Sequence, residues 1–282
     1  MKKSKLLKIR RPDLSYSNSI PRDWAQGDLV LSHMYNIFNL ILPETEKTFV
    51  KSIGSVLPYL DNDHLKILAI GYIGQEAQHA KQHKKAQNVM KAQGYKIEPI
   101  IKVLSLIGFT LPSKLFGKKF AVSLAGAFEH VTILVAKNIF SKNLLDGSNE
   151  EMRSLFEWHV AEEVEHRNAV HDIITYFCPS YFWKFFAIFL ASGILFMQSY
   201  IGTMLLLIQD GKFFSIKNQF SYFKHYGAYY PGPIEMIIDY LKPGYHPDQY
   251  MTSAIIEKAN LALKFQISKS QPSRNDVKKK TI

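Results

Sequence analysis

The chain contains one pattern of glutamate and histidine residues twice. In each copy a lone glutamate is followed, 30 or 34 residues later, by a Glu-x-x-His pair. The residues that form the two copies are Glu46, Glu76, His79, Glu129, Glu163 and His166. Positions i and i+3 of an α-helix lie on the same face, so each pair can turn a carboxylate and an imidazole toward one point. The fold must therefore supply long helices whose ligand-bearing faces converge.

Four helices that carry Glu, Glu-x-x-His, Glu and Glu-x-x-His are typical of a di-iron or di-manganese carboxylate site in a ferritin-like bundle. The pairs alone are weak evidence, because the glutamate and histidine content makes two of them only mildly surprising. The repetition of the whole pattern carries the prediction. No strand-like alternation of useful length occurs, so we predict an all-α protein. Its expected architecture is a ferritin-like four-helix bundle with a long apolar C-terminal helix and short trailing helices.

Composition and helical periodicity divide the 282-residue chain into four regions. They are a basic irregular N-terminal arm at 1–28, a di-metal helix bundle at 29–178, an apolar helix with a helical and loop extension at 179–263, and a basic tail at 264–282.

Proline and capping signals locate the first two helices of the bundle. Pro43 either ends a helix that begins near residue 29 or starts the next helix as a first-turn residue. Glu46 then lies in the opening turns of that next helix. Asp61 or Asp63 is the expected N-cap of a long second stretch, which Gly94 closes at its C′ position.

The other two bundle helices are marked in the same way. A helix that starts near Pro112 and Ser113 carries Glu129 among apolar neighbours, where an unpaired carboxylate would be costly to bury. The last helix is predicted to begin at a capping box, in which Ser148 accepts from the backbone and Glu151 reaches back.

The net charge of +11 lies in the two ends of the chain. Residues 1–11 and 264–282 account for all of it, and residues 12–263 are neutral. We therefore expect no nucleic-acid partner, and basic ends that contact an anionic membrane surface or keep the protein soluble. The N-terminus lacks the apolar stretch of a secretory signal, and the single cysteine, Cys178, favours a reducing compartment. A cytoplasmic, non-secreted protein is expected.

Residues 185–209 contain no charged side chain. At about 1.5 Å per residue, a helix of this length can cross a hydrocarbon layer of about 30 Å. Tyr181, Phe182 and Trp183 precede it, where an interfacial aromatic belt would lie. We predict that this helix associates the protein with the inner face of a membrane; a helix buried within the protein is the alternative.

Four carboxylates and two imidazoles form an oxygen-rich ligand set. Such a set suits iron or manganese better than copper, and zinc usually prefers more histidine or thiolate. We therefore expect two divalent metal ions, iron first, with manganese or zinc as alternatives. Two cations would nearly neutralise four acids that an apolar bundle could not otherwise bury.

Several residues near the pairs are further candidates. His83 and His159 each lie one helical turn from one of the two pairs. Each is an extra ligand, a group that orients the ligands, or a structural histidine. Glu162 or His159 could act as a general base if the reaction is a hydrolysis. Tyr72 is either a redox-active phenol or a core aromatic residue.

Four segments of the chain resemble a bacterial family of predicted metal-dependent hydrolases, over about residues 40–250. The segments are Ile73–His83, Ala127–His130, Trp158–His166 and Pro243–Pro247. The resemblance implies a metal site on a helical fold. Thr45 replaces the glycine of the family's Pro-x-Gly-Glu step, which leaves Glu46 as the expected ligand and Glu44 as an alternative.

Three functions fit the ligand pattern. The leading hypothesis is a di-metal enzyme that activates O₂ to oxidise a small hydrophobic substrate, such as a lipid-like molecule, with the help of an electron donor. The second is a metal-dependent hydrolase that uses metal-activated water, and the third is a non-catalytic metal-binding or storage protein. A homodimer is left open.

Overall fold

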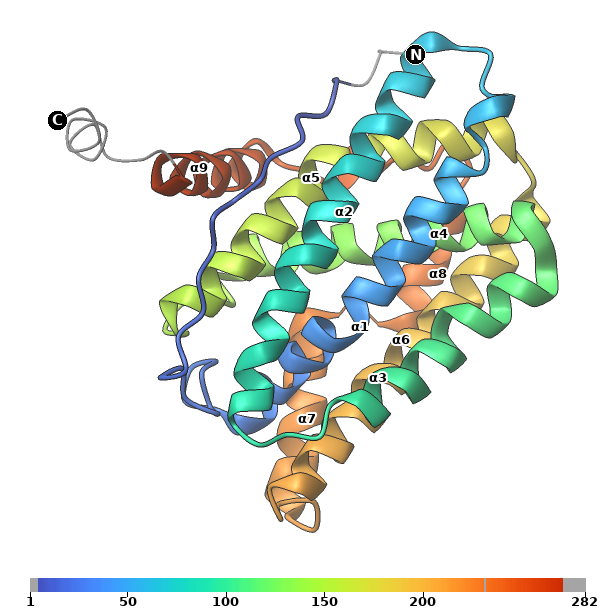
Figure 1. Cartoon of the computed structure of the whole chain (residues 1–282). Helices are drawn as coiled ribbons and strands as arrows, with labels where there is room; N and C mark the ends of the chain where they lie inside the picture. Colours follow the sequence, from blue (N-terminus) through green and yellow to red (C-terminus); the bar gives the residue numbers. More distant parts are fainter. Residues whose placement is uncertain (1–4, 231, 271–282) are drawn as a thin grey trace, which may run out of the picture.

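The computed structural model describes residues 5–230 and 232–270, and within these ranges it contains helices and turns but no strand (Figure 1). The predicted all-α class is confirmed. The α-helices are α1 (Leu29–Gly54), α2 (Asp63–Ala92), α3 (Glu98–Ser105), α4 (Leu111–Lys142), α5 (Glu150–Phe177), α6 (Tyr181–Gln209), α7 (Ile216–Tyr229), α8 (Pro233–Leu241) and α9 (Ser253–Ser270). The short helical turns are η1 (Leu57–Tyr59), η2 (Leu106–Thr110) and η3 (Pro247–Tyr250).

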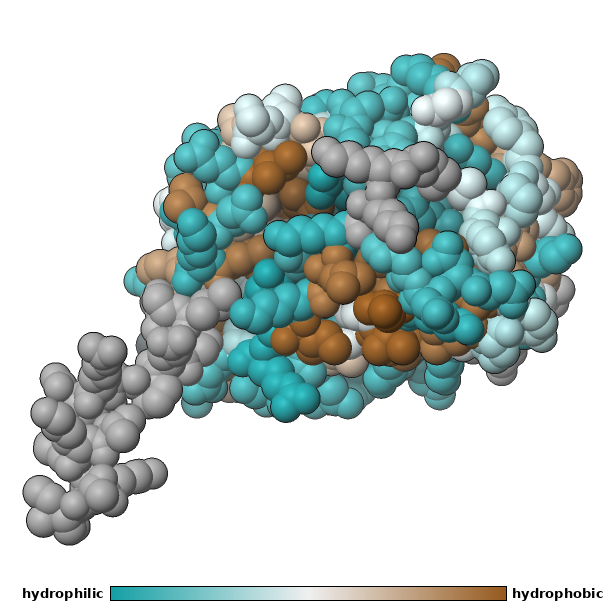
Figure 2. Space-filling view, turned by 90° about the horizontal axis from the view of Figure 1, so that it is seen from above, coloured by the Kyte–Doolittle hydropathy of each residue, from teal (hydrophilic) through white to brown (hydrophobic). Residues whose placement is uncertain are grey.

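Four long helices surround the interior in which the predicted ligands lie. α1 packs against α2, α2 against α5, α5 against α4, and α4 against α1. α6 covers α1 and α4 from outside, and α9 covers α5. The ferritin-like topology within the all-α class stays a prediction. Seen from above, the surface is mostly hydrophilic, with hydrophobic residues gathered in patches (Figure 2).

Pro43 does not divide the first helix, contrary to the sequence prediction. α1 runs through it without interruption, and Glu46 therefore lies well inside the helix rather than in its opening turns. A proline removes the N–H that would bond to the carbonyl four residues earlier. The carbonyl of Asn39 accepts instead from Gln87 Nε2 of α2, at 2.8 Å. A side chain from the neighbouring helix thus replaces the missing backbone donor.

The caps of α2 and α5 differ by one residue from the predicted ones. Asn62, rather than Asp61 or Asp63, caps α2, because its side chain accepts from the backbone N–H groups of the first turn. Gly94 is the predicted C′ residue and has a φ of 91°. The N-cap of α5 is Asn149 rather than Ser148.

Glu151 does not complete a capping box. Its carboxylate accepts from the backbone N–H and the hydroxyl of Ser17, at 2.5 and 2.9 Å, and so bonds to the N-terminal arm. Ser17, which is distant in the sequence, has thus replaced the predicted local partner, the backbone at Ser148.

The C-terminal part of the chain is more helical than its sequence indicated. We predicted short helices and loops after the apolar segment, and the structure has α7, α8 and the longer α9 there. The predicted basic tail at 264–282 begins inside α9; its residues 271–282, like residues 1–4 of the N-terminal arm, lie outside the described residues.

Residues 5–28 form an irregular arm that runs beside α2 and α5 (Figure 1). Gln75 and Gln82 of α2 donate to the carbonyls of Lys8 and Pro12, at 3.2 and 2.8 Å. The arm therefore covers the outer side of the two helices that carry the Glu-x-x-His pairs.

We predict that replacing Gln87 with alanine lowers the free energy of unfolding by about 1–3 kcal/mol, because the buried carbonyl of Asn39 loses its donor. Urea unfolding checks this value. Asn88→Ala removes an exposed amide from the same helix and is the matched control. Equal stability of the two variants would show that the Gln87 hydrogen bond does not support α1.

Candidate metal centre

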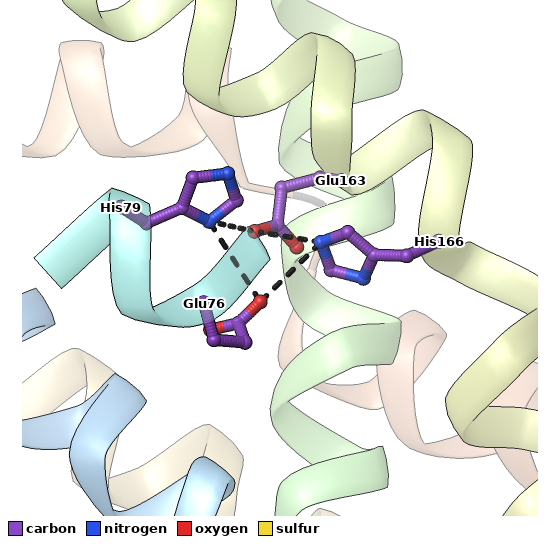
Figure 3. Close-up of side chains that lie close together, drawn as sticks. All are labelled: Glu76, His79, Glu163 and His166. Atoms are coloured by element: carbon purple, nitrogen blue, oxygen red, sulfur yellow. Dashed lines mark ion pairs between the residues drawn. The ribbon is translucent and has the colours of Figure 1, made fainter. Parts of the chain in front are cut away.

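Two carboxylates and two imidazoles from α2 and α5 face one another in the interior (Figure 3). His79 Nδ1 lies 3.7 Å from Oε1 of both Glu76 and Glu163. His166 Nε2 lies 3.4 and 3.5 Å from the same two oxygens. Two ligand atoms that share a cation at about 2.1 Å are roughly 3.0–3.4 Å apart at tetrahedral or right angles. The four atoms are thus spaced much like ligands, and most pairs are too far apart for a hydrogen bond.

Glu129 and Glu46 extend this group from α4 and α1. Glu129 Oε2 is 3.2 Å from His166 Nδ1, and its Oε1 accepts from the Tyr72 hydroxyl at 2.7 Å. Glu46 Oε1 lies 3.8 Å from His159 Nδ1. The structure therefore brings all six residues of the doubled pattern into one interior, and none is more than 3 % exposed. Glu44, the alternative to Glu46, instead pairs with Lys47 at the surface.

Buried polar atoms without a hydrogen-bond partner concentrate here. Among the described residues they include Glu46 Oε1 and Oε2, Glu76 Oε1, His79 Nδ1, Glu129 Oε2, and His166 Nδ1 and Nε2. Each such atom costs about 1–3 kcal/mol if nothing binds it. Cations would satisfy these atoms together, so the residues fit the predicted binding of divalent metal.

The protein environment alone does not stabilise four charged carboxylates. Burial, together with the neighbouring acids, raises the pKa of Glu46 and of Glu76 well above the usual range. Burial acts in the same direction on Glu163, but the imidazoles of His166 and His159 outweigh it and hold the pKa of Glu163 well below that range. Metal binding therefore has to displace protons from part of the ligand set.

His159 and His83 belong to the same interior. His159 Nε2 is 3.1 Å from Glu163 Oε1, and its Nδ1 is 2.9 Å from His83 Nε2. His83 Nδ1 in turn lies 2.7 Å from Oδ1 of Asn39. Glu46, His83 and His159 form a second group that could hold a metal. The two imidazoles can thus add a ligand or orient Glu163.

Glu162 lies behind His79. Its Oε2 is 3.0 Å from His79 Nε2, on the opposite side of the ring from the nitrogen that faces Glu76. Its Oε1 accepts from Arg10 at 2.9 Å. Burial raises the pKa of Glu162 to about 7, although Arg10 acts against this. A carboxylate on the outer nitrogen of a ligand histidine fixes the ring and raises its basicity.

Arg10 is the residue that sequence reasoning missed. It lies in the arm and also bonds to Glu165 at 2.6 Å, which fastens the arm over α5. In the sequence analysis it was only one of the basic residues among residues 1–11. No local pattern could have identified it, because its partners are more than 150 residues away.

An apolar cavity of about 80 Å³ adjoins the candidate ligands. Its walls come mainly from α1, α4, α5 and α6 and from the two tyrosines at the end of α7. Glu163 and His159 line it together with Thr132, whose hydroxyl donates to Glu163 Oε2 at 2.8 Å. A cavity of about 150 Å³ can hold benzene, so this one has room for a short apolar group.

We predict that Arg10→Ala weakens metal binding about tenfold, because loss of the charge that holds Glu162 loosens His79. Titration of the metal-free protein with Fe²⁺ or Mn²⁺ against a competing chelator measures the change. Arg11→Ala removes an exposed cation from the neighbouring position and is expected to leave the affinity unchanged. Equal affinities for both variants would exclude a role for Arg10 at the site.

A sequence model of one protein family, described as predicted metal-dependent hydrolase, matches residues 8–250. No curated protein and no solved structure matches the chain. The matched segment contains the six residues of the doubled pattern, together with Arg10 and both additional histidines. Since the match covers most of the chain, this protein belongs to the family of predicted metal-dependent hydrolases.

Proposed function

We propose that the protein is an enzyme in which two metal ions, iron first, activate O₂ to oxidise a small hydrophobic substrate. The family and the buried Glu and His groups support the coarser statement of a metal-dependent enzyme. The oxidation is our inference. The observation that carries it is an oxygen-rich ligand set beside a cavity whose exposed wall surface is almost entirely apolar.

The proposed ligands are the six residues of the doubled pattern. Glu76 and Glu163 face both imidazoles, Glu129 lies beside His166, and Glu46 lies beside His159. When bound, the iron ions supply the redox chemistry and the open coordination positions that O₂ reduction needs. An electron donor is a required partner, and manganese or zinc are the alternative metals.

The chain's own residues prepare the ligands and exclude water. Tyr72 donates to Glu129, and burial raises the pKa of its hydroxyl, so it stays a neutral donor. Thr132 fixes one oxygen of Glu163, while His159 contacts the other. The cavity places a substrate group next to Glu163, and its apolar walls favour a short alkyl group over a charged one.

The same cavity supports an enzyme over a storage protein, because storage needs no space for an organic molecule beside the metals. The second candidate is the hydrolase that the family description names. Glu162, with a pKa of about 7, has the acidity of a general base, and His159 reaches the cavity directly. Because His79 and Arg10 occupy both oxygens of Glu162, His159 is better placed to meet a substrate.

We predict that Glu76→Ala lowers the metal content of the purified protein from about two transition-metal ions per chain to less than one, because the variant loses an oxygen that faces both imidazoles. Elemental analysis measures the content. Glu44→Ala, at the surface, is the control and is expected to keep the full content. Less than one metal ion per chain in the unmodified protein would refute the two-metal proposal.

We further predict that protein loaded with Fe²⁺ without oxygen consumes O₂ when it is admitted, and that Glu163→Ala slows this uptake at least about tenfold. Oxygen-electrode traces give the rates, with Glu44→Ala again as the control. The competing assay follows 4-nitrophenyl butyrate with Mn²⁺- or Zn²⁺-loaded protein under anaerobic conditions. Ester turnover that needs neither O₂ nor reductant and disappears in Glu76→Ala would establish the hydrolase instead.

A further inference from the structure

The outer side of α6 exposes a row of large apolar side chains along nearly its whole length. The row contains Phe182, Phe185, Phe189, Phe196, Met197, Ile201 and Ile208, which are between 36 % and 66 % exposed. Apart from Phe196 and Met197, which are adjacent, they follow one another at three-, four- and seven-residue intervals, so they lie along one side of the helix. The opposite face packs against α1 and α4, and half of the most apolar window of the helix is buried.

Two neighbouring segments widen this face. α3 and η2 lie beside α6 (Figure 1) and expose Val103, Leu106 and Ile107. On α7, Phe223 stacks with Tyr200 of α6 at a ring distance of 6.0 Å. Phe223 is exposed, as are Phe214, Ile216 and Phe220 in and just before α7, and Phe214 is 93 % exposed. We call these exposed residues of α3, η2, α6 and α7 the apolar surface.

The segments around this surface are basic. Residues 99–119 and 211–234 contain seven lysines and no acid. Asp210, the acid at the end of α6, is engaged by Arg22 and His33 at 2.7 and 2.6 Å and by the Tyr95 hydroxyl. Glu98, the first residue of α3, is paired with Lys91 at 2.7 Å. The apolar surface is therefore flanked by lysines, while the nearby acids Glu98 and Asp210 are paired with other cations.

We propose that the apolar surface docks the protein onto an anionic lipid bilayer, with α6 lying in the interface and its outer row among the acyl chains. A broad apolar face with lysines at its margins complements acyl chains and anionic headgroups together. α6 does not span the bilayer, because its inner face belongs to the protein core. Gln198 on that face donates to the carbonyl of Leu104, which ties α6 to α3.

The experiment is co-sedimentation of the full chain with phosphatidylcholine vesicles, with and without phosphatidylglycerol. We expect binding to the anionic vesicles, and at least about tenfold weaker binding for Phe189→Glu combined with Phe220→Glu. Ile67→Glu combined with Ile70→Glu introduces the same charge at two exposed apolar residues of α2, outside the surface, and is the matched control. Lys212→Glu combined with Lys217→Glu should remove the preference for phosphatidylglycerol. Circular dichroism confirms that each variant is folded.

Three results would overturn the proposal. The first is full vesicle binding by the variant that combines Phe189→Glu with Phe220→Glu, or no binding of the unmodified protein to anionic vesicles. The second is a dimer that these substitutions dissociate without any vesicle binding, which would assign the surface to a second copy of the chain. The third is resistance of the membrane-bound protein to alkaline carbonate extraction, which would make α6 a spanning helix. Vesicle binding needs no metal, so these results are independent of the proposed reaction.

Discussion

The burial of carboxylates among imidazoles is the constraint on which the rest of this structure depends. An isolated charge in an apolar interior is unstable unless it is paired, protonated or bound to a metal. Here four glutamates from four helices enter one interior, and only some of their oxygens have protein partners. The bundle thus fixes a set of acids of which burial holds Glu46 and Glu76 toward the protonated form, and metal ions would take the place of those protons. This requirement explains why the ligands lie on long helices rather than on loops.

A layer of polar contacts outside the ligands keeps this arrangement in place. Arg10 holds Glu162, which holds His79. On the other side, Asn39 contacts His83, which contacts His159 and through it Glu163. The first chain of contacts begins in the N-terminal arm and the second in α1. The orientation of the candidate ligands therefore depends on segments that contribute no ligand.

The sequence predicted the all-α class and the convergence of the doubled pattern, because helical periodicity is a local property. It could not predict the uninterrupted α1, since the group that compensates for Pro43 is on another helix. It misplaced both N-caps by one residue, because asparagine, aspartate and serine compete at adjacent positions. The contacts of Arg10 could not be predicted either, because Glu162 and Glu165 are even more distant from it in the sequence than Gln87 is from Asn39. Spacing placed His83 and His159 on the ligand-bearing helix faces, but it gave no means of deciding whether each is a ligand, a group that orients the ligands or a structural histidine.

Asn39 joins two of these features in a single residue. Its backbone carbonyl is the one left without a helical donor by Pro43, and its side chain supports His83. Gln87 is therefore needed only while position 43 lacks an N–H. A residue with a backbone donor at 43 would share this carbonyl, which has two lone pairs, and would make the hydrogen bond from Gln87 dispensable. Among related proteins, positions 43 and 87 are thus expected to change together, as a pair inherited as one unit.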